Sequence, residues 1–440
     1  MRAVPDPYLP GHGDARYGVS HYDLRLDYKM ATNRLAGRAT LTVRALTPLD
    51  AVRLDLSGLS VDRVRVDGAK PKKVTAKEGA VVVRLATPLA AGATASVAVA
   101  YSGKPAPVPG AHGPAGWEEL TDGVLVASQP YGAPSFFPCN DRADDRSTYS
   151  IALTTEADYH VVATGRPTGA TTRAGRTTWT FEEASATSPY LVSLAIGRLL
   201  DGPLDDRITV VRPRRRPLPD DSPLRLLPAM MDALEGWFGA YPFSSFRAVV
   251  VDDPLEIPLE AHGMAAFGTN HLSPDWGNER LVMHELAHQW FGNAVTAALM
   301  RDIWLHEGFA CYTEWLWSER RGQGTADERA AAQWELLQGQ EQPAPLSDPG
   351  LHAMFDDWVY KRGALTLHAL RAAIGDEAFF GLCREWVSTH SGGTVSTADF
   401  RALAARYAPA DPEPLLSAWL DALPLPACPR TGPGPGTASG

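Results

Sequence analysis

Cysteines and long apolar segments are both scarce in this sequence of 440 residues. No apolar run reaches the roughly 18 residues that a membrane-spanning helix needs. The N-terminal segment MRAVPDPYLPGHGDARYG lacks the apolar stretch of a secretory signal. The four cysteines, Cys139, Cys311, Cys383 and Cys428, are scattered without a paired spacing. We therefore expect reduced thiols, a cytoplasmic location and no membrane partner.

The sequence also lacks an excess of positive charge. Lysine and arginine total 41 against 51 aspartates and glutamates, which gives a net charge of −10. Proteins that bind nucleic acid need a basic surface, so we expect no nucleic-acid partner. The short basic run RPRRRP at residues 212–217 lies between prolines, and we interpret it as an exposed loop.

Core-forming residues, in contrast, are abundant. Hydrophobic residues make up 45% of the chain and charged residues 21%, the balance of an ordinary globular protein. A chain of this length is expected to form two to three domains.

Residues 1–204 carry the pattern of β-strands. The segment YDLRLDY at residues 22–28 alternates apolar and charged residues, and ATLTVRA, AVRLDLSG, VDRVRVDG and AVVVRLA repeat that alternation. Glycine, proline and aspartate separate these short segments. Such a pattern predicts an antiparallel, β-sandwich-like N-terminal domain.

The periodicity changes near residue 205. Apolar residues in SPLRLLPAMMDALEGWF recur at helical spacing, FRAVVVDD at residues 246–253 reads as a buried strand, and the sequence from residue 279 is mostly helical. Ser396 and Asp399 predict a capping box at a helix start. We expect an α+β multidomain fold, with a mainly helical domain at residues 205–425 and a disordered, Pro/Gly-rich tail at residues 426–440.

The segment MHELAHQW contains the most informative residues. His284 and His288 stand four residues apart, so a helix places both imidazoles on one face. Two buried structural histidines would leave the neighbouring Glu285 unexplained. A catalytic zinc site needs a third protein ligand, and Glu307 in RDIWLHEGFACYTEWLW supplies one on the next predicted helix. His284, His288 and Glu307 are therefore predicted to bind one Zn²⁺ per chain.

The chemistry of such a site gives Glu285 a separate role. Zinc lowers the pKa of a bound water to about 7. Glu285 is too close along the chain to His284 to bind the same ion easily, but it can reach the water and act as general base. Asp302 has two interpretations, as the acceptor for the other N–H of a ligand histidine or as a helix N-cap.

These residues resemble the aminopeptidase N family of zinc metallopeptidases, which are relatives of thermolysin. The resemblance rests on HELAH followed after eighteen residues by the glutamate of WLHEGFA. Further similar segments are GNAVT (292–296), FFPCNDRADDRSTY (136–149), YLVSLAIG (190–197) and YKRGA (360–364), the last with its lysine and arginine shifted in register. The resemblance implies a thermolysin-like catalytic domain, peptide substrates and hydrolysis of N-terminal residues.

The resemblance also implies a donor for the oxyanion that forms when water attacks an amide. In the family the tyrosine of the Y.KGA motif has this role, and it corresponds to Tyr360. Longer family members continue into a large helical domain. The present sequence ends soon after LLSAWLDALPLP, so we expect a short form with a cleft more open on that side.

Recognition of the substrate's free α-ammonium is where the sequence departs from the family. The family uses the glutamate of a GAMEN motif, which this chain lacks. One alignment, through HGMAAFG, places Ala265 at that glutamate. The other, through IPLEA, places Glu260 there, and we prefer it because an ammonium needs an acidic partner; Glu256 is the fallback. The family's second contact, a glutamine, corresponds to Gln129 in VASQPYGAPSFFP.

The leading hypothesis is therefore a monomeric zinc aminopeptidase. A peptidase with weak N-terminal selectivity is the alternative within enzymes, because the predicted ammonium site is unusual. A non-catalytic peptide-binding scaffold is the alternative outside enzymes, but such proteins usually lose metal ligands.

Overall fold

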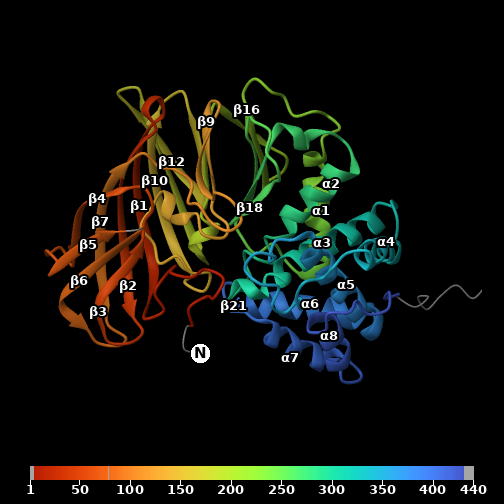
Figure 1. The fold of residues 1–440 in the computed structure, drawn as a ribbon. Coiled ribbons are helices and arrows are strands. Elements are labelled where there is room, and N and C mark those ends of the chain that lie inside the picture. Colours follow the sequence, from red (N-terminus) through yellow and green to blue (C-terminus); the bar gives the residue numbers. More distant parts are fainter. Residues whose placement is uncertain (1–3, 78, 431–440) are drawn as a thin grey trace, which may run out of the picture. The chain divides into compact units, whose positions relative to one another are not determined.

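The computed structural model describes residues 4–77 and 79–430, and its elements are labelled in Figure 1. The described residues pack into two compact units. The first contains the residues up to Ser222 together with Phe243–Ser273, and the second contains Pro223–Pro242 together with the residues from Pro274 on. We retain the boundary between residues 204 and 205 as a proposal about domain organisation.

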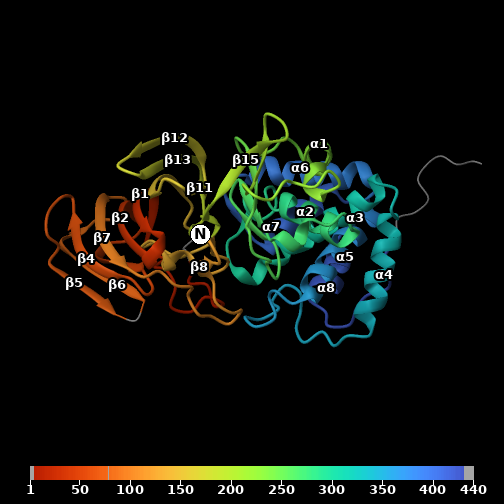
Figure 2. The ribbon, with the colours of Figure 1, turned by 90° about the horizontal axis from the view of Figure 1, so that it is seen from above.

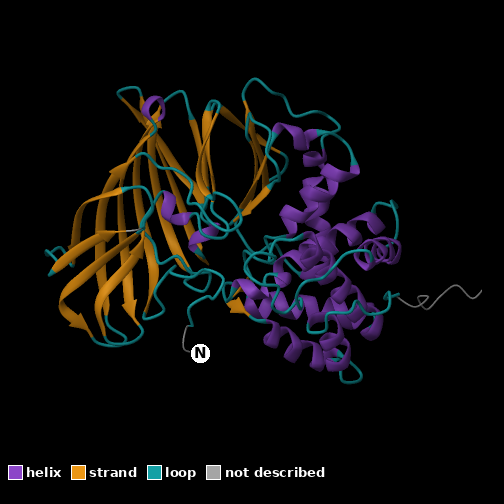
Figure 3. Cartoon of the chain, viewed as in Figure 1, coloured by secondary structure: helices purple, strands orange, loops and turns teal. Residues whose placement is uncertain are grey.

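Strands dominate the first unit, as the alternating sequence pattern predicts (Figure 3). Within the described residues its largest sheet has the order β12 (Arg166–Arg173), β13 (Arg176–Thr187), β10 (Ser147–Glu156), β1 (Tyr17–Lys29), β2 (Arg34–Ala45), β7 (Thr94–Gly103) and β4 (Ser60–Val66). Neighbours in this sheet are antiparallel except β1 and β10, which pair in parallel with His21 opposite Thr148.

Three smaller sheets complete the described part of the first unit. One has the order β3 (Leu49–Asp55), β6 (Ala80–Leu89) and β5 (Lys73–Lys77). Another has the order β11 (His160–Ala163), β14 (Leu194–Gly197), β9 (Gly123–Ala127) and β8 (Gly116–Leu120). The third has the order β15 (Leu199–Pro203), β16 (Ile208–Pro213), β17 (Phe246–Val250), β19 (Met264–Phe267) and β18 (Leu259–Ala261). Short 3₁₀ turns lie at Met30–Thr32, Ala133–Ser135, Pro189–Leu191 and Thr269–Leu272.

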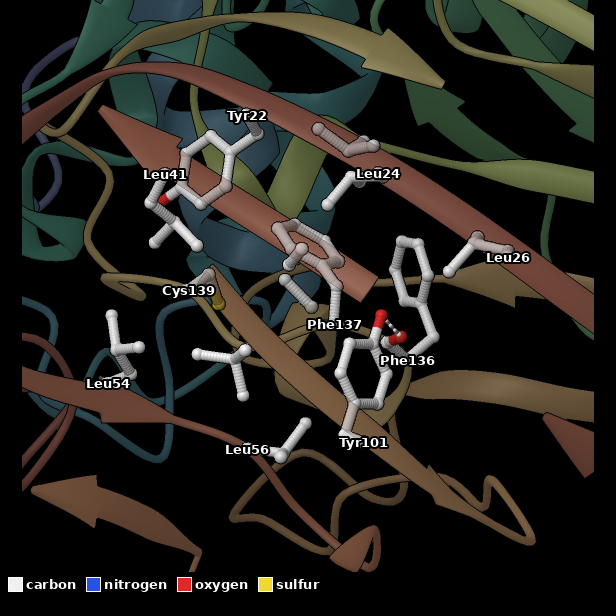
Figure 4. Close-up of a cluster of buried hydrophobic side chains, with 14 of the residues drawn as sticks. Tyr22, Leu24, Leu26, Leu41, Leu54, Leu56, Tyr101, Phe136, Phe137 and Cys139 are labelled. Atoms are coloured by element: carbon white, nitrogen blue, oxygen red, sulfur yellow. Dashed lines mark hydrogen bonds between the residues drawn. The ribbon is translucent and has the colours of Figure 1, made fainter. Parts of the chain in front are cut away.

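The core of the first unit follows from the two-residue period of its strands. Alternate residues of β1 and β2 point inward and meet side chains of β3, β6 and the segment around Phe136 and Phe137 (Figure 4). The Tyr101 hydroxyl inside this core donates a hydrogen bond of 2.8 Å to the Phe136 carbonyl. On β9, Val124 and Val126 join this core, whereas Leu125 between them joins a second core with the β15–β18 sheet.

Helices dominate the second unit. They are α1 (Leu227–Phe238), α2 (Trp276–Ala287), α3 (Trp304–Arg320), α4 (Ala326–Gln338), α5 (Asp357–Ile374), α6 (Asp376–His390), α7 (Thr397–Tyr407) and α8 (Glu413–Leu420). A two-stranded sheet, β20 (Thr296–Ala297) with β21 (Thr394–Val395), and 3₁₀ turns at Pro223–Leu226 and Met300–Asp302 also belong to it. No helix within residues 4–77 and 79–430 is long and apolar enough to cross a membrane.

Helix α3 packs closely against α5, and Figure 2 shows the two helices from above. A Cβ atom on Gly308 would lie 2.8 Å from the Cα atom of Gly363, so neither position leaves room for a larger residue. This contact sets the distance between the two helices beside Glu307 and Tyr360.

Arg362 ties α5 to the end of α8. Its guanidinium donates to the Trp419 carbonyl at 2.8 Å and to the Leu423 carbonyl at 3.0 Å, and it also bonds the Ala422 carbonyl. These carbonyls lie in or just after the last turn of α8, where backbone acceptors lack helical partners. The arginine in YKRGA therefore has a structural role.

The predicted fold class is confirmed, with a strand-rich N-terminal part followed by a helical part. The buried strand predicted at residues 246–253 is β17, and Ser396 and Asp399 form the predicted capping box. In the basic run, Arg212 and Pro213 end β16, and residues 214–217 are exposed. Of the tail predicted to be disordered at residues 426–440, residues 426–430 are described and have no helix or strand, and residues 431–440 lie outside the described residues.

Candidate metal centre

The two histidines of the HELAH segment lie at the end of α2. Asp275 begins this helix by accepting a 3.0 Å hydrogen bond from the Asn278 amide. His284 lies in the last turn, and His288 follows directly with helical dihedral angles. The His288 amide donates to the His284 carbonyl at 3.2 Å, so the helical register continues and both imidazoles lie on one face.

Glu307 in the first turn of α3 meets both imidazoles. Its Oε2 lies 3.3 Å from His284 Nε2 and 3.4 Å from His288 Nε2. One donor atom from each of the three residues lies within 4.8 Å of the others, and all three side chains are buried. The structure thus brings the three predicted ligands together.

The donor spacing suits a small tetrahedral cation. Ligands about 2.0–2.1 Å from a zinc ion lie roughly 3.3 Å apart at the corners of a tetrahedron. The measured 3.3 and 3.4 Å between nitrogen and oxygen match that spacing. Two imidazoles and one carboxylate also leave one tetrahedral position for a water or substrate, as in catalytic zinc sites.

The second nitrogen of each imidazole has its own partner. His284 Nδ1 lies 2.8 Å from Glu314 Oε1, and His288 Nδ1 lies 3.0 Å from the Phe291 carbonyl. These acceptors hold the proton on Nδ1 and leave Nε2 of each ring as the metal donor.

Glu314 was absent from the sequence predictions, although its spacing carried a signal. It follows Glu307 by seven residues, two helical turns, and so lies on the same face of α3. Asp302 had two interpretations, as this acceptor or as a helix N-cap, and the first is wrong because the Nδ1 partners are Glu314 and the Phe291 carbonyl. The Asp302 carboxylate accepts from the Thr397 amide at 3.2 Å and hydroxyl at 2.6 Å, at the start of α7 rather than as a cap of its own helix.

Cations surround Glu314. The Arg280 guanidinium lies 3.2 Å from its Oε2, and Lys361 lies nearby with Nζ 3.5 Å from Cys311 Sγ. Burial would raise the pKa of Glu314, but Lys361, His284 and Arg280 together lower that pKa to about 2. Glu314 is therefore an ionised acceptor for His284.

The same charges act on the predicted ligands. Burial would lower the pKa of His284, but hydrogen bonds to Glu307 and Glu314 raise that pKa to about 9. Burial would raise the pKa of Glu307, and the two histidines instead hold it well below its usual value. A proton on His284 and a metal ion would thus compete for the same nitrogen.

Two further predicted residues lie beside the ligands. Glu285 is only 4% exposed, and one of its carboxylate oxygens lies within 4.8 Å of a ring nitrogen of His288. Tyr360, in the first turn of α5, is half-buried, and its ring stacks on that of His284 with centroids 5.9 Å apart. The second unit therefore assembles all five residues of the predicted reaction centre.

Glu260 and Gln129, the predicted ammonium contacts, belong to the first unit. Glu260 on β18 pairs directly with Ala265 on β19, and directly opposed residues of antiparallel strands place their side chains on the same face. Glu260 and Ala265, the residues that the two alignments place at the GAMEN glutamate, are thus neighbours on one face of the sheet. The buried Nε2 of Gln129, in the loop after β9, has no hydrogen-bond partner among the described residues. Glu256 is exposed.

Comparison with known proteins places these observations in a family. Residues 224–419 match the peptidase family M1 domain, and residues 19–191 match the peptidase M1 N-terminal domain. The structure of an M1 zinc metallopeptidase from Deinococcus radiodurans superposes with a TM-score of 0.87 at 32% identity, covering 97% of this chain and 99% of that one. The chain belongs to peptidase family M1.

Two curated relatives are more distant in sequence than the Deinococcus radiodurans protein, and both are longer than the present chain. The chain is 26% identical to leucine aminopeptidase 2 of Phaeosphaeria nodorum over 68% of its length, and 25% identical to aminopeptidase N of Lactobacillus helveticus over 91%. It covers 51% and 50% of those two relatives, so it spans about half the length of the curated relatives it matches.

The contact between Glu314 and His284 generates the first prediction. Glu314→Gln keeps the size of the side chain but removes the charge that orients His284, so zinc affinity should fall by roughly 10- to 100-fold. Competition with a chelating dye measures this affinity. Glu319→Gln, on the same helix but largely exposed, is the matched control and should bind zinc like the wild type. If Glu314→Gln binds zinc as tightly as the wild type, Glu314 does not orient His284 for metal binding.

Proposed function

We propose that this chain is a zinc-dependent aminopeptidase that removes N-terminal residues from peptides. The observation that carries the proposal is the buried donor set of His284, His288 and Glu307, with Glu285 beside it, in a chain of peptidase family M1. The names of the curated relatives, leucine aminopeptidase 2 and aminopeptidase N, support the reaction class. A variant of the Deinococcus radiodurans M1 zinc metallopeptidase has been solved with a Tyr-Ser-Ala substrate, which supports peptide substrates.

His284, His288 and Glu307 would hold the zinc ion. When bound, zinc would supply a Lewis acid that lowers the pKa of a water molecule to about 7 and polarises the peptide carbonyl. Glu285 takes the proton from the attacking water and delivers it to the nitrogen of the leaving amine as the C–N bond breaks. Its burial favours this exchange, because a carboxylate shielded from bulk water keeps the transferred proton.

Tyr360 stabilises the negative charge that develops on the carbonyl oxygen. Its ring lies against the ligand His284, and its hydroxyl is the side-chain donor that we assign to this oxyanion. The close contact of α3 and α5 at Gly308 and Gly363 supports this role, because it fixes the helix of Tyr360 against the helix of Glu307.

Glu260 and Gln129 recognise the free α-ammonium of the substrate. Glu260 contributes a carboxylate from β18, across the strand pair from Ala265, the residue that the other alignment places at the family's glutamate. Gln129 contributes its side-chain amide, with the carbonyl oxygen as the acceptor for an ammonium N–H. Binding of the ammonium by these two residues would limit cleavage to the first peptide bond.

A peptidase with weak N-terminal selectivity is the second candidate, and Ala265 in place of the motif glutamate is the observation that favours it. A non-catalytic scaffold is disfavoured because the donor set and both reaction-centre residues are present. A cytoplasmic location and a monomeric state stay predictions.

Replacement of the general base tests the reaction directly. Glu285→Gln should bind zinc with near wild-type affinity, because Glu285 is not a ligand, yet kcat should fall by roughly two to four powers of ten. The measurement is hydrolysis of aminoacyl-coumarin amides by protein with a verified zinc content. Glu279→Gln, on the same helix but bonded to Trp317, is the control and should retain most of the rate. A Glu285→Gln variant that turns over at a rate near wild type would refute the assignment.

Removal of the Tyr360 hydroxyl should lower kcat by roughly two to three powers of ten, the typical loss for one oxyanion donor. Tyr360→Phe keeps the ring that stacks on His284, so zinc content and KM should change little. Steady-state kinetics with the same substrates separate kcat from KM. Tyr407→Phe, which removes a hydroxyl on α7 that donates to Glu385 on α6, is the control. If kcat of Tyr360→Phe stays at the wild-type value, another group stabilises the oxyanion.

Loss of the ammonium contact should change selectivity rather than chemistry. Glu260→Ala should reduce kcat/KM for substrates with a free N-terminus by roughly one to two powers of ten, the usual value of a hydrogen bond to a charged group. Glu256→Ala, the exposed alternative, should have a smaller effect. The panel includes N-acetylated peptides, which the wild type should reject. Equal cleavage of acetylated and free peptides by the wild type would favour the second candidate function.

A further inference from the structure

One carboxylate connects a surface cation to a predicted metal ligand. Glu314 on α3 accepts from His284 Nδ1 through Oε1 at 2.8 Å and from Arg280 NH1 through Oε2 at 3.2 Å. Arg280 precedes His284 by four residues, so both side chains leave α2 on the same face. The guanidinium and the imidazole thus approach the same carboxylate from one helix, and each uses a different oxygen.

Arg280 and Glu314 differ in exposure. The Glu314 side chain is 4% exposed, whereas the Arg280 side chain is 35% exposed. A buried carboxylate that loses one of its hydrogen-bond partners is left with a less satisfied oxygen, which costs free energy and favours rotation of the group. Rotation of Glu314 would disturb the acceptor geometry at His284 Nδ1 and, through the ring, the direction of Nε2.

We propose that Arg280 is a positioning residue for the metal centre, which holds Glu314 in the orientation that directs His284 Nε2 toward Glu307. The proposal rests on the metal site assigned under the proposed function. Arg280 touches neither substrate nor ion and acts only through Glu314.

A second arginine–glutamate pair between α2 and α3 does not contact a predicted metal ligand, so it provides a comparison for Arg280. Arg321 Nε lies 3.1 Å from Glu279 Oε1, with side chains 42% and 12% exposed. This pair joins the same two helices, but Glu279 otherwise bonds Trp317 rather than a predicted ligand. If the role of Arg280 were only to join α2 and α3, loss of either arginine should have the same effect.

The test is zinc affinity, measured by competition with a chelating dye. Arg280→Met, which keeps an unbranched apolar stem but removes the charge and the N–H donors, should weaken zinc binding by several-fold to about tenfold, less than the loss expected for Glu314→Gln. Arg280→Lys should restore most of the affinity, because an ammonium can still pair with Glu314. Arg321→Met should bind zinc like the wild type.

The double variant Arg280→Met/Glu314→Gln decides whether the two residues act in one pathway. Because Arg280 acts through Glu314, its loss should add little to Glu314→Gln alone. Fully additive losses, or wild-type affinity in Arg280→Met, would overturn the proposal. Should Arg280→Met not fold, Arg280→Gln provides the same comparison. A wild-type protein that binds no zinc would instead refute the proposed function, so the two failures are distinguishable.

Discussion

The second unit depends on one constraint. It buries two imidazoles, of His284 and His288, together with the carboxylate of Glu307. A buried carboxylate such as Glu307 is costly unless positive charge lies beside it. Two sources can supply that charge. Hydrogen bonds to Glu307 and Glu314 raise the pKa of His284 to about 9, so its imidazole can carry a proton. The spacing of the donor atoms also suits a divalent cation. The same electrostatic demand is thus met by a proton in the metal-free protein or by a metal ion, and the two compete for His284 Nε2.

Helix α3 transmits this constraint to the rest of the unit. Its first turn contributes Glu307, the next residue, Gly308, sets the contact with α5, and Glu314 two turns later orients His284. Helix α5 then carries Tyr360 to the site and Arg362 to the end of α8. The two cations of YKRGA have separate roles. Lys361 lowers the pKa of Glu314, whereas Arg362 donates to backbone carbonyls.

Sequence patterns predicted the features that depend on interactions between residues close together in the chain. The alternation in β1, the capping box at Ser396 and the spacing of His284 and His288 depend on residues a few positions apart, and all were recognised. The contacts that the sequence did not predict join segments that are far apart in the chain. Asp302 bonds Thr397, β1 pairs in parallel with β10, and Phe243–Ser273 packs with the first unit. Nothing in the neighbouring residues of any of these segments specifies its partner. Glu314 is an intermediate case, because its helical spacing from Glu307 was visible but its bond to His284 was not.

Under the proposed function, the strand register around Ala265 offers a carboxylate beside the position at which one alignment of the family motif loses its glutamate. Two sequence alignments, one through Ala265 and one through Glu260, look incompatible along the chain, since five positions separate the residues. In the β18–β19 hairpin, with His262 and Gly263 at its turn, they stand directly opposite each other. Opposed residues have Cβ atoms about 5 Å apart on one face, which a glutamate side chain can span. The proposed role of Glu260 in binding the ammonium would favour a small side chain at residue 265, because the two residues stand opposite each other on one face of the hairpin.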